Sequence, residues 1–211
     1  MKQLFFLIFF INYALAYEFK LNKKDIKYIN NSDKKSFIEN RLDKYKNLKI
    51  QVKNYEVIKK LSYINSFVNK ILPAYDTSTQ ASLDYWATPK EFLFQGHGDC
   101  EDYVITKYFT LLEVGIPKEK LYFAVVDIKG QKDSHMILLY LETKESTPLI
   151  LDNLSSMVIP LTRRKLIPKF AFNEIDSYKF THEKFTEKVK INWGKENKWE
   201  KLLFRVYTLN E

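Results

Sequence analysis

The first half of the chain has apolar residues at helical spacing. Positions 37, 38, 42 and 45 follow capping residues at 31–33, which predicts an amphipathic helix over about 33–47. A longer apolar stripe predicts a second helix over about 52–72, ending before Pro73. Both stripes are typical of helices that bury one face against a core.

A connecting stretch and a third helix follow. Residues 73–97 carry no clear period, and a connection of that length inside a compact domain is usually functional. Residues 99–114 then predict a helix that Gly115 and Pro117 end. Residues 17–30 show no element.

The pattern changes to strands after residue 120. Segments rich in β-branched and aromatic residues predict strands at 121–128, 134–141 and 148–151. Further strands are expected after residue 154, with candidates at 178–180, 189–191 and 202–207. Helices followed by antiparallel strands predict an α+β fold.

The first 16 residues are typical of a secretory signal peptide. One positive charge precedes an apolar run over 4–11, and Ala14-Leu15-Ala16 is a small-x-small cleavage pattern. The run is too short to span a bilayer, which needs about 20 apolar residues. A buried strand or a lipid-tethering anchor are the alternatives. With the leader removed, we expect a single exported domain over 17–211 that does not span a membrane.

The charge balance is basic, with a formal net charge of +8. The lysines are scattered and interleaved with acids, which favours a solvated surface and no nucleic-acid partner. The one compact basic cluster, Arg163-Arg164-Lys165, is either a solvated turn or a docking point for an acidic substrate or receptor.

Cys100 is the only cysteine, so the chain cannot form an internal disulfide. It falls at the first turn of the predicted 99–114 helix, where unpaired N–H groups and the helix dipole favour a thiolate. The same N–H groups can hold an oxyanion. Burial as a small apolar residue, or pairing with a partner chain, are the inert explanations.

Two residues in the strand region fit the partners that a thiolate nucleophile needs. His135 interrupts the apolar run of the second strand, and Asp152 ends the third strand 17 residues later. Neighbouring strands can place the Asp beside the His to fix its orientation. Each signal is weak alone, but Cys100, His135 and Asp152 together fit a nucleophile, a base and an orienting acid.

Three acids beside the thiol raise a physical conflict. Asp99, Glu101 and Asp102 would raise the thiol pKa and oppose its activation. They either cap the helix and complement its dipole, or they hold a cation. Clustered carboxylates suit Ca²⁺, so these three residues are candidate metal ligands.

At these residues the sequence resembles the bacterial transglutaminase-like cysteine proteinases, in particular their periplasmic LapG type. The resemblance covers about residues 63–173. It rests on Asp84-Tyr85-Trp86-Ala87-Thr88-Pro89, Glu91-Phe92-Leu93, Gly96, Gly98-Asp99-Cys100-Glu101-Asp102-Tyr103, His135-Met136 and Leu151-Asp152-Asn153-Leu154.

The resemblance implies a papain/transglutaminase-like fold and a triad of Cys100, His135 and Asp152. It implies that Ca²⁺ is required and is held by Asp99 and Glu101, with Asp102 as a further candidate. The implied substrate is the N-terminal region of a large surface adhesin, whose release disperses a biofilm. The implied partner is an inner-membrane cyclic-di-GMP receptor of the LapD type.

The sequence leaves the role of Trp86 and two other functions open. Trp86 either covers the site and donates a hydrogen bond from its indole, or packs in the core. A transglutaminase-like acyl transferase would use the same triad, and a non-enzymatic periplasmic binding module would keep the fold without the chemistry.

Overall fold

The computed structural model describes residues 17–74, 85–181, 184–194 and 196–208. The expected leader over 1–16 lies outside these ranges, so the signal peptide and the domain start at residue 17 stay predictions. Within the described ranges no helix combines the length and the apolar character that a bilayer crossing requires.

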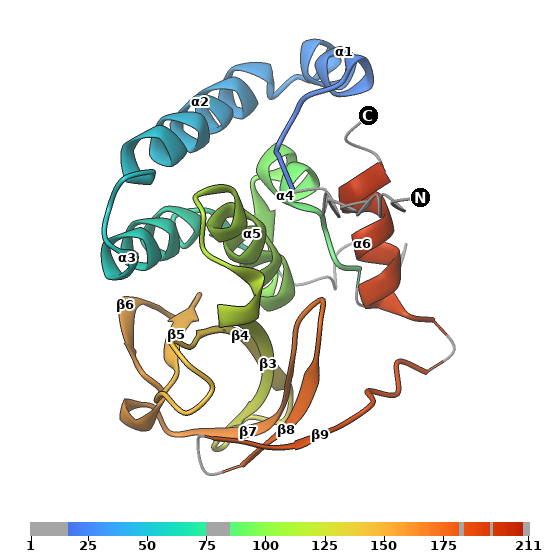
Figure 1. The fold of residues 1–211 in the computed structure, drawn as a ribbon. Helices are drawn as coiled ribbons and strands as arrows, with labels where there is room; N and C mark the ends of the chain where they lie inside the picture. The colour runs from blue at the N-terminus through green and yellow to red at the C-terminus, as the bar shows by residue number, and fades with distance from the viewer. Residues whose placement is uncertain (1–16, 75–84, 182–183, 195, 209–211) are drawn as a thin grey trace, which may run out of the picture.

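Helices form one layer of the molecule (Figure 1). Their bounds are α1 (Lys23–Asn31), α2 (Lys35–Val52), α3 (Val57–Val68), α4 (Pro89–Gln95), α5 (Cys100–Glu113) and α6 (Lys198–Thr208). Helix α5 packs against both α3 and strand β4, so it lies between the outer helices and the sheet. The helix that carries Cys100 is therefore in the centre of the fold.

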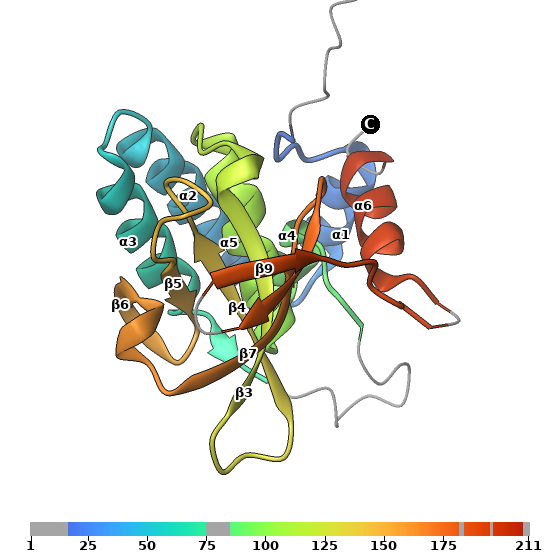
Figure 2. The ribbon, with the colours of Figure 1, turned by 60° about the horizontal axis from the view of Figure 1, so that its bottom comes forward.

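An antiparallel sheet forms the second layer (Figure 2). In the described residues it has seven strands in the order β6-β5-β4-β3-β7-β8-β9. Their bounds are β3 (Leu121–Ile128), β4 (Ser134–Tyr140), β5 (Leu149–Asp152), β6 (Ser155–Pro160), β7 (Leu166–Phe172), β8 (Ser177–Thr181) and β9 (Lys184–Lys188). Two-residue strands β1 (Leu72–Pro73) and β2 (His97–Gly98) pair in parallel and tie the end of the α3 segment to the residues before Cys100.

Side chains of the central strands alternate between two cores, as a strand period of two requires. Phe123, Leu138 and Tyr140 join the large core beneath the helices. Tyr122, Ala124, Ile137 and Leu139 join a smaller core on the other face, which Phe180 completes. A sheet buried on both faces explains why 121–128 and 134–141 are continuous apolar runs.

Several sequence predictions are confirmed and others are corrected. The helix predicted over 33–47 is α2, the 99–114 helix is α5, and the strands at 121–128, 134–141, 148–151 and 178–180 are present. The predicted 52–72 helix is shorter, because α2 runs to Val52 and a turn separates it from α3. Residues 17–30, left without an element, contain most of α1, which Asn22 caps through its side chain.

The connecting stretch over 73–97 is not wholly irregular, since it contains α4. Thr88 caps this helix, Pro89 occupies its first turn, and Glu91 closes a capping box. These residues are a sequence signature of a helix start. The helix was not predicted because it is too short to show an apolar stripe.

The C-terminal predictions were wrong in two places. Residues 202–207 belong to α6, where Trp199, Leu202 and Val206 are buried at helical spacing. Asn197 accepts a hydrogen bond from the N–H of Glu200, so a cap marks this helix too. Residues 189–191 form no strand, and β6 and β7 were not among the specific candidates.

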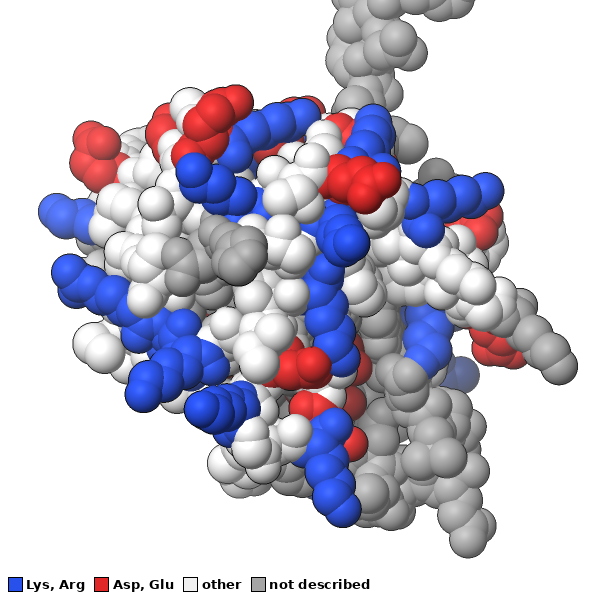
Figure 3. All heavy atoms as spheres, turned by 90° about the horizontal axis from the view of Figure 1, so that it is seen from below, with Lys and Arg blue, Asp and Glu red and all other residues white. Residues whose placement is uncertain are grey.

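The surface carries the basic charge in a dispersed form. Figure 3 shows Lys and Arg side chains over much of one face, with smaller groups of Asp and Glu among them. Several lysines are paired with acids: Lys169 contacts Asp127 at 2.8 Å, and Lys120 contacts Glu142 at 2.6 Å. Exposed pairs of this kind contribute about 0–1 kcal/mol each to stability.

Candidate active site

Cys100 is the first residue of α5, as the sequence predicts. Asp99 is the N-cap residue, and the Asp102 carboxylate reaches back to the N–H of Asp99 at 3.4 Å. Asp102 also accepts a hydrogen bond from the N–H of Ala87 at 2.7 Å. The helix start that carries the thiol is therefore tied to the segment before α4.

The two glycines before Cys100 are required by the local course of the backbone. A Cβ on Gly98 would lie 2.5 Å from the Asp102 carboxylate and 2.7 Å from the Phe92 ring. Gly96 ends α4 with φ 75°, in the left-handed region that favours glycine. Both residues allow the chain to turn from α4 directly into α5.

His135 and Asp152 lie in contact at the heart of the site. Asp152 Oδ1 is 2.9 Å from His135 Nε2 and also accepts the N–H of Leu154 at 2.9 Å. The other carboxylate oxygen, Oδ2, accepts a hydrogen bond from Arg164 Nη2 at 2.7 Å. The Asp152 side chain is 0% exposed, so these bonds replace its hydration.

These partners keep Asp152 ionised. Burial works to raise the pKa of the Asp152 carboxyl, but the bonds from His135 and Leu154 and the charges of His135 and Arg164 lower it below the ordinary value. An ionised carboxylate only accepts hydrogen bonds, so His135 Nε2 must carry the proton that is donated. In the neutral ring Nδ1 then has the free lone pair, as a base toward Cys100 requires.

Cys100 lies beside the strand that carries His135. Cys100 packs against the core cluster that contains Met136, the residue next to His135, and the backbone N–H of Met136 lowers the pKa of the Cys100 thiol. The structure thus places the start of α5 against β4, the strand that carries His135, and places His135 in contact with Asp152 of the neighbouring strand β5.

The Cys100 thiol is not activated by its own surroundings. Burial raises the pKa of Cys100 well above its ordinary value, and the charge of Glu101 and the hydrogen bond to it raise it further. The Cys100 sulfur is 2.9 Å from Glu101 Oε2. The Met136 N–H lowers this pKa and Asp99 raises it, but the net effect favours the thiol. The conflict expected from the sequence is therefore present in the structure.

The three acids predicted as metal ligands differ in their surroundings. Glu101 contacts the sulfur and Asp99 is half-buried beside it, whereas Asp102 is buried and holds the backbone N–H groups of Ala87 and Asp99. In the described part of the chain no three His, Cys, Asp or Glu side chains are grouped as a metal site. Two carboxylates of the set are thus placed to supply oxygen ligands, which would need backbone or water oxygens in addition.

Trp86 packs in the core. It is 7% exposed, stacks on Phe172 with ring centroids 6.4 Å apart, and meets Trp193 edge-on at 5.9 Å. Its carbonyl accepts a hydrogen bond from Arg205 of α6. The packing alternative left open by the sequence is therefore realised, and a donor role for the indole stays a prediction.

Sequence reasoning missed the residues that hold Asp152. Arg164, expected at a turn or docking point, instead pairs with Asp152, while Arg163 beside it is exposed. Asn69, at the end of α3, donates to the carbonyls of Asp152 at 2.8 Å and Ser155 at 2.9 Å. The Arg-Arg-Lys cluster was visible in the sequence, but which Arg turns inward depends on the fold. Nothing in the sequence marks Asn69.

Arg164→Ala is expected to lower kcat/KM and to move the acid limb of the pH–rate profile to higher pH. Removal of a cation raises the Asp152 pKa, so the carboxylate is lost earlier on acidification. An effect of about tenfold on kcat/KM corresponds to one pKa unit of lost interaction. Arg163→Ala, at the exposed neighbour, is the matched control and should leave the profile unchanged. Equal effects of the two variants would assign Arg164 to substrate docking instead.

Comparison with known proteins identifies relatives of this architecture. The family model of the bacterial transglutaminase-like cysteine proteinases matches residues 25–170. A solved structure of calcium-bound LapG from Legionella pneumophila is 33% identical, covers 86% of this chain and 97% of that chain, and superimposes with a TM-score of 0.71. The EGTA-treated LapG of the same organism is 32% identical over 90% of this chain and 100% of that chain, with a TM-score of 0.74. No curated protein sequence gives a match.

These findings confirm the fold class expected from the sequence, an α+β fold of the transglutaminase-like cysteine proteinase type. The match includes the start of α5 and strands β4 and β5, which carry the three candidate residues. The chain therefore belongs to the family of bacterial transglutaminase-like cysteine proteinases.

Proposed function

We propose that this protein is a calcium-dependent periplasmic cysteine endopeptidase that cuts the N-terminal region of a large surface adhesin. The main support for enzymatic activity is the contact between His135 Nε2 and the buried Asp152. A thiol at a helix start, Cys100, is the proposed nucleophile. Membership of a cysteine proteinase family supports a hydrolytic reaction.

The geometry supports a role for each member of the proposed triad. Asp152 accepts the Nε2–H of His135 and so leaves Nδ1 to take the Cys100 proton. The thiolate attacks the carbonyl carbon of the scissile peptide, and the C–N bond breaks as the imidazolium gives its proton to the leaving amine. Water, deprotonated by the same ring, then hydrolyses the thioester and regenerates the thiol.

The start of α5 supplies the electrostatic part of the reaction. The backbone N–H groups of its first turn have no partner within the helix, and the helix dipole adds positive potential there. The N–H of Cys100 is the group we assign to the oxyanion of the tetrahedral intermediate. Removal of one such donor typically lowers kcat by about 10²–10³-fold.

Calcium is the cofactor that resolves the electrostatic conflict at the thiol. Glu101 and Asp99 are the residues we assign as ligands, since their carboxylates flank Cys100 and raise its pKa. Asp102 is assigned to the backbone bonds it makes and supports the ligand loop. A bound divalent cation supplies positive charge that offsets these carboxylates. The similarity to a calcium-bound LapG supports this assignment.

The substrate, compartment and partner follow from the LapG-type resemblance. We assign the protein to the periplasm, its substrate to a surface adhesin whose release disperses a biofilm, and its regulator to an inner-membrane cyclic-di-GMP receptor of the LapD type. The signal-like residues 1–16 support export.

The test is cleavage of the N-terminal fragment of the adhesin encoded with this protein. We expect wild type to cut it in calcium, to stop in EGTA and to recover when calcium is restored. Cys100→Ala should be inactive under every condition, because no other thiol exists in the chain. Thermal unfolding of each sample shows whether EGTA acts on the site or on the fold.

Each alternative outcome has a defined meaning. Cutting that persists in EGTA contradicts the calcium assignment and keeps the protease. Crosslinked products on addition of a primary amine identify an acyl transferase instead. Binding of the fragment without cutting, unchanged in Cys100→Ala, identifies a binding module.

A further inference from the structure

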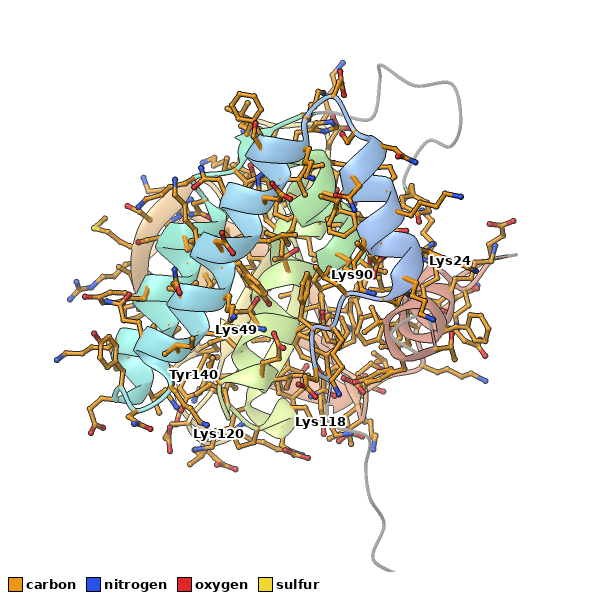
Figure 4. The ribbon with its side chains drawn as sticks, turned by 90° about the horizontal axis from the view of Figure 1, so that it is seen from above. Lys24, Lys49, Lys90, Lys118, Lys120 and Tyr140 are labelled. Carbon is orange, nitrogen blue, oxygen red and sulfur yellow. The ribbon has the colours of Figure 1, made fainter. Side chains whose placement is uncertain are left out.

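Helices α2 and α3 form the walls of a groove at the surface of the molecule. The two helices lie side by side (Figure 4, blue and teal) and contact each other, and the groove between them has a volume of about 830 Å³. Phe37 of α2, Tyr63 of α3 and Leu72 of β1 line it and are 69%, 43% and 70% exposed. Large apolar side chains that are exposed together, with polar residues around them, are typical of a surface that binds a partner.

The groove uses a face of α2 that the core does not use. Ile38 and Tyr45 point into the core and are 1% exposed each. Phe37, Arg41 and Lys44 follow one another at helical spacing along the groove instead. Packing in the core therefore does not explain why a Phe stands at position 37.

The charged side chains that line the groove are all basic. They are Arg41, Lys44 and Lys70, and among the described residues that line the groove there is no Asp or Glu. Helix α2 does carry acids, but outside the groove, where Glu39 pairs with Lys35 at 3.7 Å. A lining that is both apolar and positively charged is complementary to an acidic segment with an apolar side chain, and it disfavours a basic one.

The groove ends beside the residues that lead to the nucleophile. Leu72 and Gly96 both line it, and Leu72 pairs with His97 in the β1–β2 ladder. Gly96 is four residues before Cys100, so these two residues are at most about 14 Å apart. About four residues of an extended peptide cover that distance. A peptide bound at Cys100 can therefore reach the groove with residues close to its cleaved bond.

Arg41 is a fixed cation in the groove lining. Its Nη1 donates to the carbonyl of Leu93 at 2.5 Å, near the end of α4. A Cβ on Gly96 would overlap the Arg41 guanidinium, so the glycine makes room for this side chain. The backbone that leads to Cys100 and the positive charge of the groove are thus in direct contact.

We propose that this groove binds an acidic segment of the protein substrate that flanks the cleaved bond. One large apolar side chain of the segment packs against the exposed aromatic surface of the groove, and its carboxylates pair with Lys44 and Lys70. This inference rests on the proposed function, because it places a substrate chain at Cys100. Binding of a peptide in the groove is nevertheless measurable without any cleavage.

The test measures binding to Cys100→Ala protein in calcium, which cannot cut what it binds. The probe is a fluorescein-labelled peptide of Glu residues with one central Trp, followed by fluorescence anisotropy in about 0.1 M salt. Lys44→Glu with Lys70→Glu should raise its Kd by about tenfold or more, because two attractions become repulsions. Lys46→Glu with Lys59→Glu makes the same charge change on the same two helices, at exposed residues outside the groove lining. This matched control should change the Kd by less than about twofold.

The apolar part of the groove has its own variant. Phe37→Ala should raise the Kd of the Trp probe by about fivefold and leave the Kd of a probe with Gly in place of Trp unchanged. Ile50→Ala is the control, since Ile50 is 66% exposed on α2 but does not line the groove. All these side chains are exposed, so the Tm of each variant should stay close to that of Cys100→Ala alone.

The N-terminal adhesin fragment identifies the occupant of the groove. Its affinity for the same proteins should fall in the Lys44/Lys70 double variant and in Phe37→Ala, as that of the Trp probe does. Failure of Cys100→Ala protein to bind the acidic probe, or an equal loss in the matched control, overturns the proposal.

Two further results would replace the substrate with another occupant. A fragment that binds the groove variants as tightly as the controls assigns the groove to a different acidic partner. A dimer that Phe37→Ala dissociates assigns it to a second copy of this chain. Both results overturn the substrate assignment. A wild-type protein whose groove binds the probe but which cuts no fragment refutes the proposed function and leaves the acidic-peptide site standing.

Discussion

Asp152→Asn is expected to lower kcat/KM by about 10²–10⁴-fold, because an amide cannot satisfy the partners of this side chain. Asp152 Oδ1 accepts from His135 and Leu154, and Oδ2 accepts from Arg164. If the amide oxygen keeps the first two partners, its NH₂ group faces a guanidinium donor. If the amide flips, the NH₂ group faces the His135 ring and favours the wrong tautomer.

The structure also predicts how to recover part of this loss. In Asp152→Asn combined with Arg164→Gln, the glutamine oxygen can accept from the amide, so the asparagine oxygen can face His135. We expect the double variant to regain about tenfold over the single variant, measured as kcat/KM on the adhesin fragment. Asp43→Asn, at an exposed position of α2, controls for the charge change. A double variant no better than the single one contradicts the role of Arg164.

Glu101→Gln is expected to have opposite effects with and without calcium. In EGTA the loss of the carboxylate at 2.9 Å from the sulfur lowers the thiol pKa, so alkylation of Cys100 at pH 7 becomes about tenfold faster than in wild type. In calcium the variant lacks an assigned ligand, so we expect cleavage of the adhesin fragment to fall by about 10²-fold or more. The measurements are the alkylation rate and kcat/KM over a calcium titration.

Glu119→Gln removes an equal charge from an exposed position and is the matched control. Equal alkylation rates of Glu101→Gln and wild type in EGTA would show that Glu101 does not suppress the thiol. Normal activation of Glu101→Gln by calcium would remove Glu101 from the ligand set. The first result concerns the effect of Glu101 on the thiol, and the second concerns its role as a calcium ligand.

Helices and strands with a regular hydrophobic pattern over their whole length were predictable from the sequence. Helix α5 and strands β3 and β4 match their predicted ranges within about two residues. The short α4 and the amphipathic α6 were missed, although Thr88 and Asn197 provide capping signals. Residues 202–207 are a short apolar and aromatic run that fits a strand or a helix, and only the burial of Trp199, Leu202 and Val206 shows that it is a helix.

The site was predictable where one residue type is rare and its chemistry is specific. The positions of His135 and Asp152 on successive strands were enough to predict the contact between them, and Cys100 is at the helix start that the sequence predicts. The calcium ligands were less well defined. Asp99, Glu101 and Asp102 are equivalent as a charge cluster in the sequence, but Asp102 turns toward the backbone of Ala87.

The sequence by itself determined the fold class, helices α2 and α5, strands β3 to β5, the position of the thiol and the sign of the charge around it. These depend on local period, on capping and on neighbours within a few residues. The tertiary structure alone decided that Arg164 and not Arg163 holds Asp152, and that Asn69 donates a hydrogen bond to the carbonyl of Asp152. Such contacts join residues 12 to 83 positions apart, and their energies depend on burial, which no local pattern encodes.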